Sequence, residues 1–376
     1  MSETSSNAPL AGIKVVELAR ILAGPWAGQV LADLGAEVIK VESPEGDDTR
    51  QWGPPFIDRP DGTKDAAYFH AANRGKDNMV ADFNRAGDLN KVKALIAEAD
   101  VVIENFRVGS LAKFGLDYKS LVANHPGLVY CSITGFGHDG PYAGRAGYDF
   151  IIQGMSGIMD LTGFPDGAPT KIGVAYADIM TGLYAVIGIQ AALRQREATG
   201  RGQLVDMALF DVMVGTLGNQ AMNYLVSGRS PKRMGNAHPN IAPYEAFEAK
   251  DGWLIVAVGN DRQYRRFAEA IDLPAREEWT TNARRVKNRT SLSAAIAMRV
   301  KEMKRDDLLL KLENRSIPAG PINNVKQALT DPQIVARGMV VDLGETGLKG
   351  LRTPIRFSDA DLALGKPSPA LPRQED

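Results

Sequence analysis

Short apolar runs alternate with longer amphipathic segments over the first half of the chain. The runs at residues 13–18, 37–42, 78–83, 101–104 and 128–134 have the length and composition of strands, and residues 26–34 and 86–99 have the spacing of helices. Gly35 follows the first predicted helix, at a position where helices commonly end. Strands that alternate with helices pair in parallel, so the pattern predicts an α/β fold with a Rossmann-like, doubly wound parallel sheet.

The pattern changes in the second half. A helix is predicted from Asp178 to about residue 199, then a strand at 203–209 and a helix at 210–225. Beyond Gly228 a polar loop leads to a predicted hairpin at 246–258, followed by helical segments to about residue 314. We therefore expect a large α/β domain at residues 1–225, completed by the C-terminal segment 330–376, and a smaller α+β domain at 226–329.

Composition narrows the class of protein. Of the 376 residues, 44% are hydrophobic and 24% are charged, which is typical of a globular protein, and the net charge of −1 favours neither nucleic acid nor membrane as a partner. The longest uncharged stretch, residues 212–228, is too short to span a bilayer, and residues 1–7 resemble a loose polar tail without a signal sequence. Because Cys131 is the single cysteine, no internal disulfide can form, and we predict a cytoplasmic protein.

Several common types of site are not indicated. The chain has neither a glycine-rich dinucleotide fingerprint nor a phosphate loop, and Ser156 lacks the spacing of a nucleophile elbow. Cys131 lies in an apolar run, and we interpret it as a core residue. The histidines are too scattered for a metal site, so none is predicted: His70, His125, His138 and His238.

Asp178 is the strongest candidate for chemistry. A β-like run at 171–177 ends at this carboxylate, and an apolar helical run follows without another charge until Arg194. A carboxylate at a strand-to-helix turn faces the positive end of the helix dipole, which would keep it ionised beside free N–H groups. That environment suits a nucleophile whose attack creates an oxyanion. Aspartate is also among the best capping residues, so Asp178 alone fits either role.

The carboxyl ends of the predicted strands are where ligands bind in doubly wound sheets. Tyr148 and Asp149 follow the last of these ends, where they either anchor a loop or place a phenol and a carboxylate over a pocket. Cations are spread over these ends, each typical of a solvated surface alone, but together able to hold a phosphate-bearing ligand: Arg20, Lys40, Arg50, Arg107, Lys113 and Arg145. These patterns do not identify the reaction.

Longer motifs add a resemblance. Seven segments, at residues 22–25, 33–42, 46–50, 102–106, 132–137, 176–178 and 199–203, are similar to motifs of the class III coenzyme A transferases. This is the CaiB/BaiF family, which also includes the α-methylacyl-CoA racemases, and the likeness covers nearly the whole chain. The resemblance implies coenzyme A as a co-substrate and no tightly bound cofactor.

In transferases of this family the aspartate that matches Asp178 is the nucleophile. By resemblance, its carboxylate attacks an acyl-CoA thioester to give a mixed anhydride, and the released CoA thiolate then forms an aspartyl-CoA thioester. An acceptor carboxylate takes up CoA through a second anhydride. Every intermediate is hydrolysable, so such a site must exclude water.

CoA contacts carry over by position. The family's first CoA-binding loop matches Ile21, Leu22 and Ala23, and its second segment matches Ala81, Asp82, Phe83 and Asn84. Its third loop matches Asn105, Phe106 and Arg107, followed by the basic residue Lys113. The pair beside the thioester matches Tyr148 and Asp149. Ser43 stands where formyl-CoA transferases carry an arginine that reaches the adenine, so we do not expect that contact here.

Two positions separate the branches of the family. Racemases carry a histidine where this chain has Tyr148, and a phenol with a pKa near 10 is a poor acid/base partner, which favours transfer over 2-methylacyl-CoA racemisation or epimerisation. The segment 233–243 has no glycine run, which argues against a formyl-CoA:oxalate-type transferase. Together with residues 52–56 and 320–324, that segment resembles the succinyl-CoA:dicarboxylate branch, such as succinate–hydroxymethylglutarate CoA-transferase. Asn236, His238 and Arg145 are candidates for binding the acceptor.

The resemblance also implies an assembly. Relatives form interlocked homodimers, and the predicted split large domain is consistent with that arrangement. The expected partners are a second copy of the chain, an acyl-CoA, expected to be succinyl-CoA or a similar dicarboxylyl-CoA, and a small carboxylic acid. A non-catalytic acyl-CoA-binding subunit is a third hypothesis, against which Asp178 argues. The sequence does not name the donor acyl group or the acceptor.

Overall fold

The computed structural model describes residues 7–59, 62–344 and 347–372. The predicted tail at residues 1–7 therefore lies outside the described residues except for Asn7. The chain divides into two compact units. The first comprises Met1–Ile158, Lys171–Leu225 and Pro332–Asp376, and the second comprises Met159–Thr170 and Val226–Asp331. The predicted large domain includes residues 159–170, which group with the second unit in the structure.

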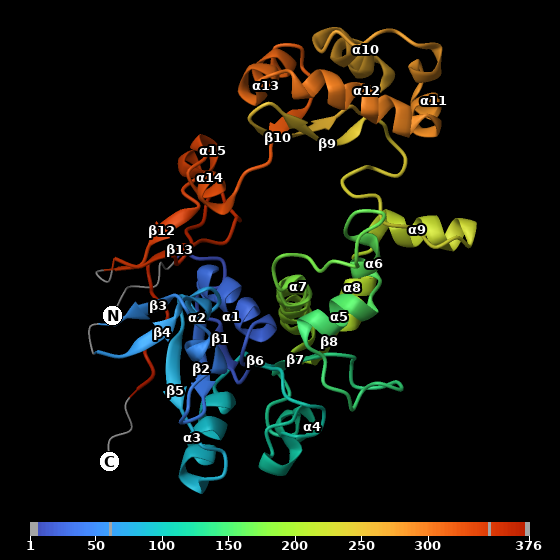
Figure 1. Cartoon of the computed structure of the whole chain (residues 1–376). Coiled ribbons are helices and arrows are strands. Elements are labelled where there is room, and N and C mark those ends of the chain that lie inside the picture. The colour runs from blue at the N-terminus through green and yellow to red at the C-terminus, as the bar shows by residue number, and fades with distance from the viewer. Residues whose placement is uncertain (1–6, 60–61, 345–346, 373–376) are drawn as a thin grey trace. The chain divides into compact units, whose positions relative to one another are not determined.

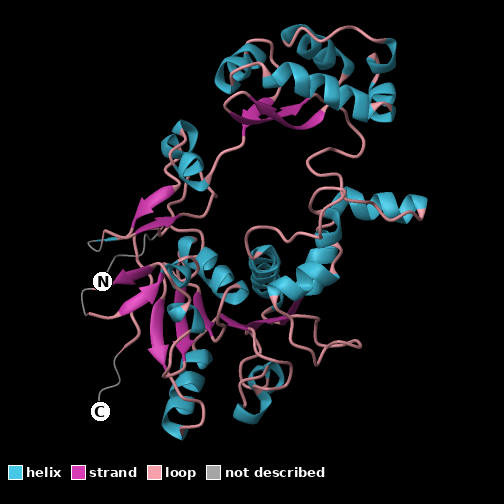
Figure 2. Cartoon of the chain, in the orientation of Figure 1, coloured by secondary structure: helices cyan, strands magenta, loops and turns pink. Residues whose placement is uncertain are grey.

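A six-stranded parallel sheet forms the centre of the first unit (Figure 2). Its strands are β1 (Lys14–Glu17), β2 (Glu37–Glu42), β5 (Asp77–Val80), β6 (Val101–Glu104), β7 (Val129–Thr134) and β8 (Leu204–Ala208). The order is β5-β2-β1-β6-β7-β8, and every neighbouring pair is parallel. This is the doubly wound order, which confirms the predicted fold class. It reverses between β1 and β6, where such sheets bind ligands.

Helices cover both faces of this sheet (Figure 1). One face packs against α1 (Ala23–Asp33), α5 (Asp149–Met155), α7 (Tyr176–Thr199) and α8 (Leu209–Gly215). The other packs against α3 (Ala86–Ala97) and the segment of α4 (Tyr118–Val122). Side chains alternate between the faces, since Val101 and Ile103 lie in one apolar core and Val102 in the other.

Glycines let α1 and α7 approach each other closely. A Cβ atom on Gly182 of α7 would lie 2.7 Å from the carbonyl oxygen of Ala23, the first residue of α1. Only glycine fits at that distance. α7 is also the one helix of the described residues that is long and apolar enough to span a bilayer by length and composition. Its contacts with α1, β7 and β8 make it a core helix of this unit.

The structure differs from the sequence predictions around these elements. No strand precedes Asp178, because residues 171–175 form an irregular segment. The helix predicted at 210–225 is two helices, α8 and α9 (Gly218–Ser227), since the chain turns at residues 216 and 217. The sequence analysis also missed several short elements of this unit: η1 (Asp48–Gln51), the hairpin of β3 (Phe56–Asp58) and β4 (Lys64–Ala66), α2 (Ala67–His70), η2 (Ala112–Phe114), α15 (Pro332–Ala336), and the pair β12 (Val340–Asp342) and β13 (Lys349–Leu351).

The C-terminal segment is held to the rest of the first unit by hydrogen bonds to its backbone. The Asp33 carboxylate accepts the Thr353 N–H at 2.9 Å, and Gly75 N–H donates to the Lys366 carbonyl at 3.0 Å. Arg50 donates to the Pro369 carbonyl at 3.2 Å. The segment has almost no regular structure, so it depends on side chains of the unit for hydrogen bonds that a helix would satisfy internally.

The second unit is a small α+β body. Its sheet has the order β11-β10-β9, with β9 (Tyr244–Ala249), β10 (Gly252–Ala257) and β11 (Ala319–Pro321) all antiparallel. The β9–β10 hairpin confirms the predicted one. Four helices bury the sheet's apolar side: α10 (Asp261–Ala270), α11 (Asn282–Lys287), α12 (Arg289–Lys301) and α13 (Arg305–Glu313). Further short helices are α6 (Ile158–Leu161), at the boundary, η3 (Glu277–Trp279) and α14 (Val325–Leu329).

Candidate active site

Asp178 is the third residue of α7, not its cap. The capping position is Ala175, which has no side chain able to cap, and the N–H of Ala177 donates to the Asp149 carboxylate at 2.8 Å. Within the described part of the chain, no hydrogen bond or salt bridge satisfies the Asp178 carboxylate. The capping interpretation of Asp178 is therefore wrong, because Asp149 binds the start of the helix instead.

Asp149 is held rigidly beside α7. It is the first residue of α5, and its second carboxylate oxygen accepts a hydrogen bond from Gln153 Nε2 at 2.8 Å. The buried Gln153 side chain also accepts the Ile172 N–H at 2.9 Å. The loop before α5 returns to β7 at Gly147, whose backbone touches Gly135 so closely that neither residue has room for a Cβ atom. These contacts fix the Asp149 carboxylate at the start of α7, where it lines the same cavity as Asp178.

The proximity of these carboxylates changes the acidity of the site. Burial and the charge of Asp149 raise the pKa of Asp178 to about 7. The sequence analysis predicted a fully ionised carboxylate, but with a pKa of about 7 the Asp178 side chain is only about half ionised at neutral pH. Burial, with the charges of Asp178, Asp149 and Asp47, also raises the pKa of Tyr68, which puts this phenol in the same electrostatic environment.

The start of α1 faces the same space. Asp178 and Gly182 are one turn apart on α7, so they share a helix face, and Gly182 touches Ala23. α1 has no side-chain cap and no acidic residue in its first turn. Its first N–H groups have no partner within the helix, and Leu22 and Ala23 line a cavity together with Asp178. Such donors can stabilise an oxyanion formed when Asp178 reacts.

Two cavities adjoin at the switch point of the sheet. The cavity of about 480 Å³ contains Asp178, Asp149 and Tyr148, and the cavity of about 370 Å³ lies beside Ser43 and Asn84. Both are lined by Arg20 and Phe106, which follow β1 and β6. Cavities that share lining residues are neighbours, which is the arrangement that an extended ligand would need.

The candidate CoA contacts gather around these cavities. The reactive cavity is lined by Ile21, Leu22, Ala23, Asn105, Phe106, Arg107, Tyr148 and Asp149, and the other by Ala81, Asp82, Phe83 and Asn84. Lys113 lies beside them, with its ammonium 4.6 Å from the Phe114 ring centroid. Phe114 in turn packs against Phe83 with ring centroids 5.5 Å apart, which gives an apolar platform.

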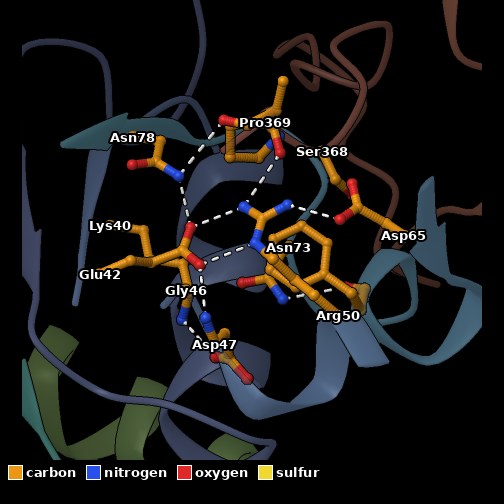
Figure 3. Close-up of polar contacts among 12 residues, drawn as sticks. Lys40, Glu42, Gly46, Asp47, Arg50, Asp65, Asn73, Asn78, Ser368 and Pro369 are labelled. Atoms are coloured by element: carbon orange, nitrogen blue, oxygen red, sulfur yellow. Dashed lines mark hydrogen bonds and ion pairs between the residues drawn. The ribbon is translucent and has the colours of Figure 1, made fainter. Parts of the chain in front are cut away.

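Two of the six loop cations are unavailable to a ligand. Lys40 is fully buried and pairs with Glu17 and Asp47, and Arg50 pairs with Glu42 and Asp65 (Figure 3). The hypothesis that all six loop cations bind a ligand is therefore wrong for Lys40 and Arg50, because both are buried in ion pairs. Arg20, with 61% of its side chain exposed, remains accessible, as do Arg107, Lys113 and Arg145.

The three acceptor candidates lie in different units. Arg145 lines the Asp178 cavity, and its guanidinium lies 4.5 Å from the Tyr142 ring centroid. Asn236 and His238 belong to the second unit. Asn236 is exposed, whereas the His238 ring accepts the Asn240 N–H at 3.1 Å and packs on Tyr244 with centroids 5.2 Å apart.

Sequence reasoning missed residues that act on the site through others. Gln153 orients Asp149, and Tyr68 adds a phenol near both carboxylates. Asp47 accepts the Ile21 N–H at 3.1 Å. None of them stands out in a single sequence, since each becomes meaningful only when a distant segment is placed next to it.

Comparison with known proteins identifies the family. A model of CoA-transferase family III matches residues 10–375, nearly the whole chain. The chain belongs to CoA-transferase family III. The resemblance inferred from its motifs is confirmed, and the chain is a CoA-transferase enzyme with CoA as a co-substrate.

Two curated members and one solved structure illustrate the relationship. The succinate–glutarate CoA-transferase of Agrobacterium fabrum is 54% identical over 371 residues, which is 96% of this chain and 93% of that protein. The human succinyl-CoA:glutarate CoA-transferase is 39% identical, over 98% of this chain and 85% of that protein. The crystal structure of a CaiB/BaiF family protein from Brucella suis is 62% identical, with a TM-score of 0.90 and 97% of each chain covered.

Proposed function

We propose that this family III enzyme transfers CoA from succinyl-CoA, or a similar dicarboxylyl-CoA, to a second dicarboxylic acid through covalent intermediates on Asp178. The observation that carries the proposal is the Asp178 carboxylate, without a hydrogen-bond partner in the described chain, in a cavity shared with the start of α1. A carboxylate that makes no such contact contributes little to stability, which supports a role in the reaction.

The geometry supports a defined sequence of steps. The ionised Asp178 attacks the thioester carbon, and the tetrahedral oxyanion collapses to a mixed anhydride as CoA thiolate leaves. The thiolate attacks the aspartyl carbon, which releases succinate and leaves an aspartyl-CoA thioester. The acceptor carboxylate attacks the aspartyl-CoA carbonyl carbon and expels CoA thiolate, which forms a second anhydride. The thiolate then attacks the acceptor's acyl carbon, which releases the Asp178 carboxylate and gives the new acyl-CoA. Each step passes through an oxyanion that the N–H groups of Leu22 and Ala23 can stabilise.

We assign the nucleotide part of CoA to the cavity beside Ser43 and Asn84, and the thioester to the cavity of Asp178. The two cavities meet at Arg20 and Phe106. The Phe83–Phe114 platform offers a stacking surface for adenine, while Arg20, Arg107 and Lys113 offer positive charge to the phosphates. Asn236, His238 and Arg145 are our candidates for the far carboxylate of the acceptor.

Glutarate is the first acceptor to test, since both curated relatives named above carry it in their names. Succinate and glutarate differ by one methylene, a difference that binding pockets discriminate by about 1–3 kcal/mol. A panel of diacids of increasing length would therefore rank acceptors by kcat/KM.

The test is intact-mass spectrometry after mixing the protein with succinyl-CoA, followed by hydroxylamine trapping and peptide mapping. We expect an adduct on Asp178 that is absent from Asp178→Ala, with glutaryl-CoA formed when glutarate is added. No adduct in a folded protein that binds CoA would refute the succinyl-CoA assignment. Solvent deuterium entering the α-carbon of a 2-methylacyl-CoA without an acceptor would instead indicate a racemase.

We also propose that the active form is an interlocked homodimer in the cytoplasm. Apolar side chains on α7 and α9 are exposed in the first unit, including Ile187 at 62% and Leu225 at 70%, and α9 buries none of its residues. A second copy of the chain is the expected cover. Light scattering should give a dimer mass, and Leu225→Glu should shift it toward the monomer. The buried, unpaired thiol of Cys131 supports a reducing compartment.

A further inference from the structure

The turn between β1 and α1 contains a strained residue. Ile21 has φ 70°, in the left-handed region that β-branched side chains avoid. Such a conformation is unfavourable for isoleucine and persists only when the surroundings impose it. Leu22 and Ala23, which line the reactive cavity, follow directly, so the strain lies next to the proposed oxyanion donors.

Side chains from three other segments hold the backbone of this turn. Lys40 Nζ donates to the Ala19 carbonyl at 2.8 Å. The Asn105 side chain accepts the Arg20 N–H at 2.9 Å and donates to the Arg20 carbonyl at 2.7 Å. Asp47 accepts the N–H of Ile21 itself at 3.1 Å. Of these contacts, the one from Asp47 acts on the strained residue.

Asp47 is built into a rigid frame. Its side chain is fully buried and lies 2.9 Å from Lys40 Nζ. Its own N–H donates to Glu42 at 2.7 Å, and Arg50 holds that glutamate in place at 2.6 Å (Figure 3). Although burial acts to raise it, Lys40 and hydrogen bonds from Thr49 keep the pKa of Asp47 below its usual value, so the carboxylate is charged.

We propose that Asp47 is a positioning residue for the transfer reaction. It holds Ile21 in the left-handed conformation and thereby aims the first N–H groups of α1 at the oxyanions formed on Asp178. Asp47 accepts a hydrogen bond from the backbone of Ile21 and contacts none of the reacting atoms, so it acts through the β1–α1 turn. The inference rests on the proposed function.

The test exploits the fact that glycine adopts positive φ without strain. The effect of Asp47→Ala on kcat, on KM for succinyl-CoA and on thermal stability is measured twice, in the natural chain and in an Ile21→Gly background. Any effect of Ile21→Gly itself cancels in this comparison. If Asp47 works by imposing φ on residue 21, kcat falls about tenfold or more in the natural chain and about threefold or less in the glycine background.

A matched control removes a second buried carboxylate. Asp33 is also buried, pairs with the buried Arg74 and accepts a backbone N–H from Thr353. Asp33→Ala should lower the melting temperature by the same amount in both backgrounds. Its effect on kcat should also be the same in the natural chain and in the Ile21→Gly background. Such a control separates loss of stability from loss of positioning.

Equal kcat losses from Asp47→Ala in both backgrounds would overturn the inference and leave the proposed function intact. A natural chain that forms no Asp178 adduct would instead refute the proposed function. Should Asp47→Ala fail to fold, Asp47→Asn carries the same cycle, because its amide is a weaker acceptor for Ile21. The loss of kcat caused by Asp47→Asn should then be about threefold or more larger in the natural chain than in the Ile21→Gly background. Equal losses of kcat in the two backgrounds contradict the proposal.

Discussion

Asp178 lies where its charge is unfavourable. A cavity wall desolvates it, and Asp149 repels it, so its pKa rises to about 7. A carboxylate in this state is more basic than an exposed aspartate, and no hydrogen bond from the described residues holds it back from attack. The reactivity of Asp178 and its unfavourable effect on stability therefore have the same physical origin. One measurement of activity and one of stability can test these two consequences.

The first prediction concerns pH. We expect kcat/KM for succinyl-CoA to fall as pH drops below about 7, because the nucleophile must be ionised in the free enzyme. Asp149→Asn removes the like charge, so it should move this acidic limb to lower pH. Initial rates over a pH series measure the acidic limb of the natural protein and that of Asp149→Asn. An acidic limb that stays in place in Asp149→Asn would contradict the assignment of the titration to Asp178.

The second prediction concerns stability. Folding raises the pKa of Asp178 from 3.8 to about 7, so ionising this carboxylate destabilises the folded protein. The loss of stability is absent below pH 3.8, grows as the pH rises toward 7, and is complete above that value. Asp178→Asn should thus abolish transfer and yet stabilise the protein by about 1–3 kcal/mol at slightly alkaline pH.

Chemical denaturation at two pH values tests this expectation. The gain of Asp178→Asn should shrink as pH approaches the ordinary value for an aspartate, about 4. The exposed Asp166 offers a matched control, because Asp166→Asn should change stability little at either pH. A loss of stability in Asp178→Asn at alkaline pH would show that the carboxylate is a structural partner.

At the scale of elements, the site depends on two helix starts brought together. α1 supplies N–H groups, α7 supplies Asp178, and Gly182 allows the contact between them. We predict that Gly182→Ala lowers kcat about tenfold, since an added methyl 2.7 Å from the Ala23 carbonyl must push the helices apart. Steady-state kinetics with the trapping assay would measure it.

The same helix provides the control for this prediction. A Cβ on Gly188 would meet only a methyl of Val205, on the side of β8. Gly188→Ala makes the same gain in helix propensity, about 1 kcal/mol, without touching α1. We expect Gly188→Ala to keep the natural kcat. If both variants lose activity equally, the approach of α1 to α7 is not what matters.

At the scale of the whole molecule, the C-terminal segment stabilises the unit that holds the site. Carbonyls of Ser368 and Pro369 accept hydrogen bonds from Arg59 and Arg50, and Arg50 also holds Glu42, which binds the N–H of Asp47. Residues 368 and 369 are thus connected to the frame behind the β1–α1 turn.

Deleting residues 367–376 should therefore do more than shorten the chain. Buried arginine donors left without acceptors cost about 1–3 kcal/mol, so the melting temperature should fall by several degrees. We also expect a higher KM for succinyl-CoA. Deleting only residues 373–376, which include none of these acceptors, is the control. Unchanged stability in the longer deletion would show that the segment is dispensable.

Periodicity in the sequence determined the larger elements. The predicted strands at 37–42 and 101–104 have the bounds that the structure shows, because both are short segments rich in valine and isoleucine between clear turn signals. The family motifs pointed to Asp178 as the nucleophile, which the cavity supports but does not test. These are local signals, carried by neighbouring residues, and one sequence contains them.

The tertiary structure decided what depends on distant segments. No pattern in the sequence shows that Asp149, and not Asp178, caps α7, or that their proximity raises a pKa. Lys40 and Arg50 look like ligand cations until the fold buries them with Asp47 and Glu42. Strain at Ile21 is equally invisible, since it is imposed by side chains that only the folded chain brings to that turn. Spacing along a chain predicts elements, whereas charge, burial and strain belong to contacts between them.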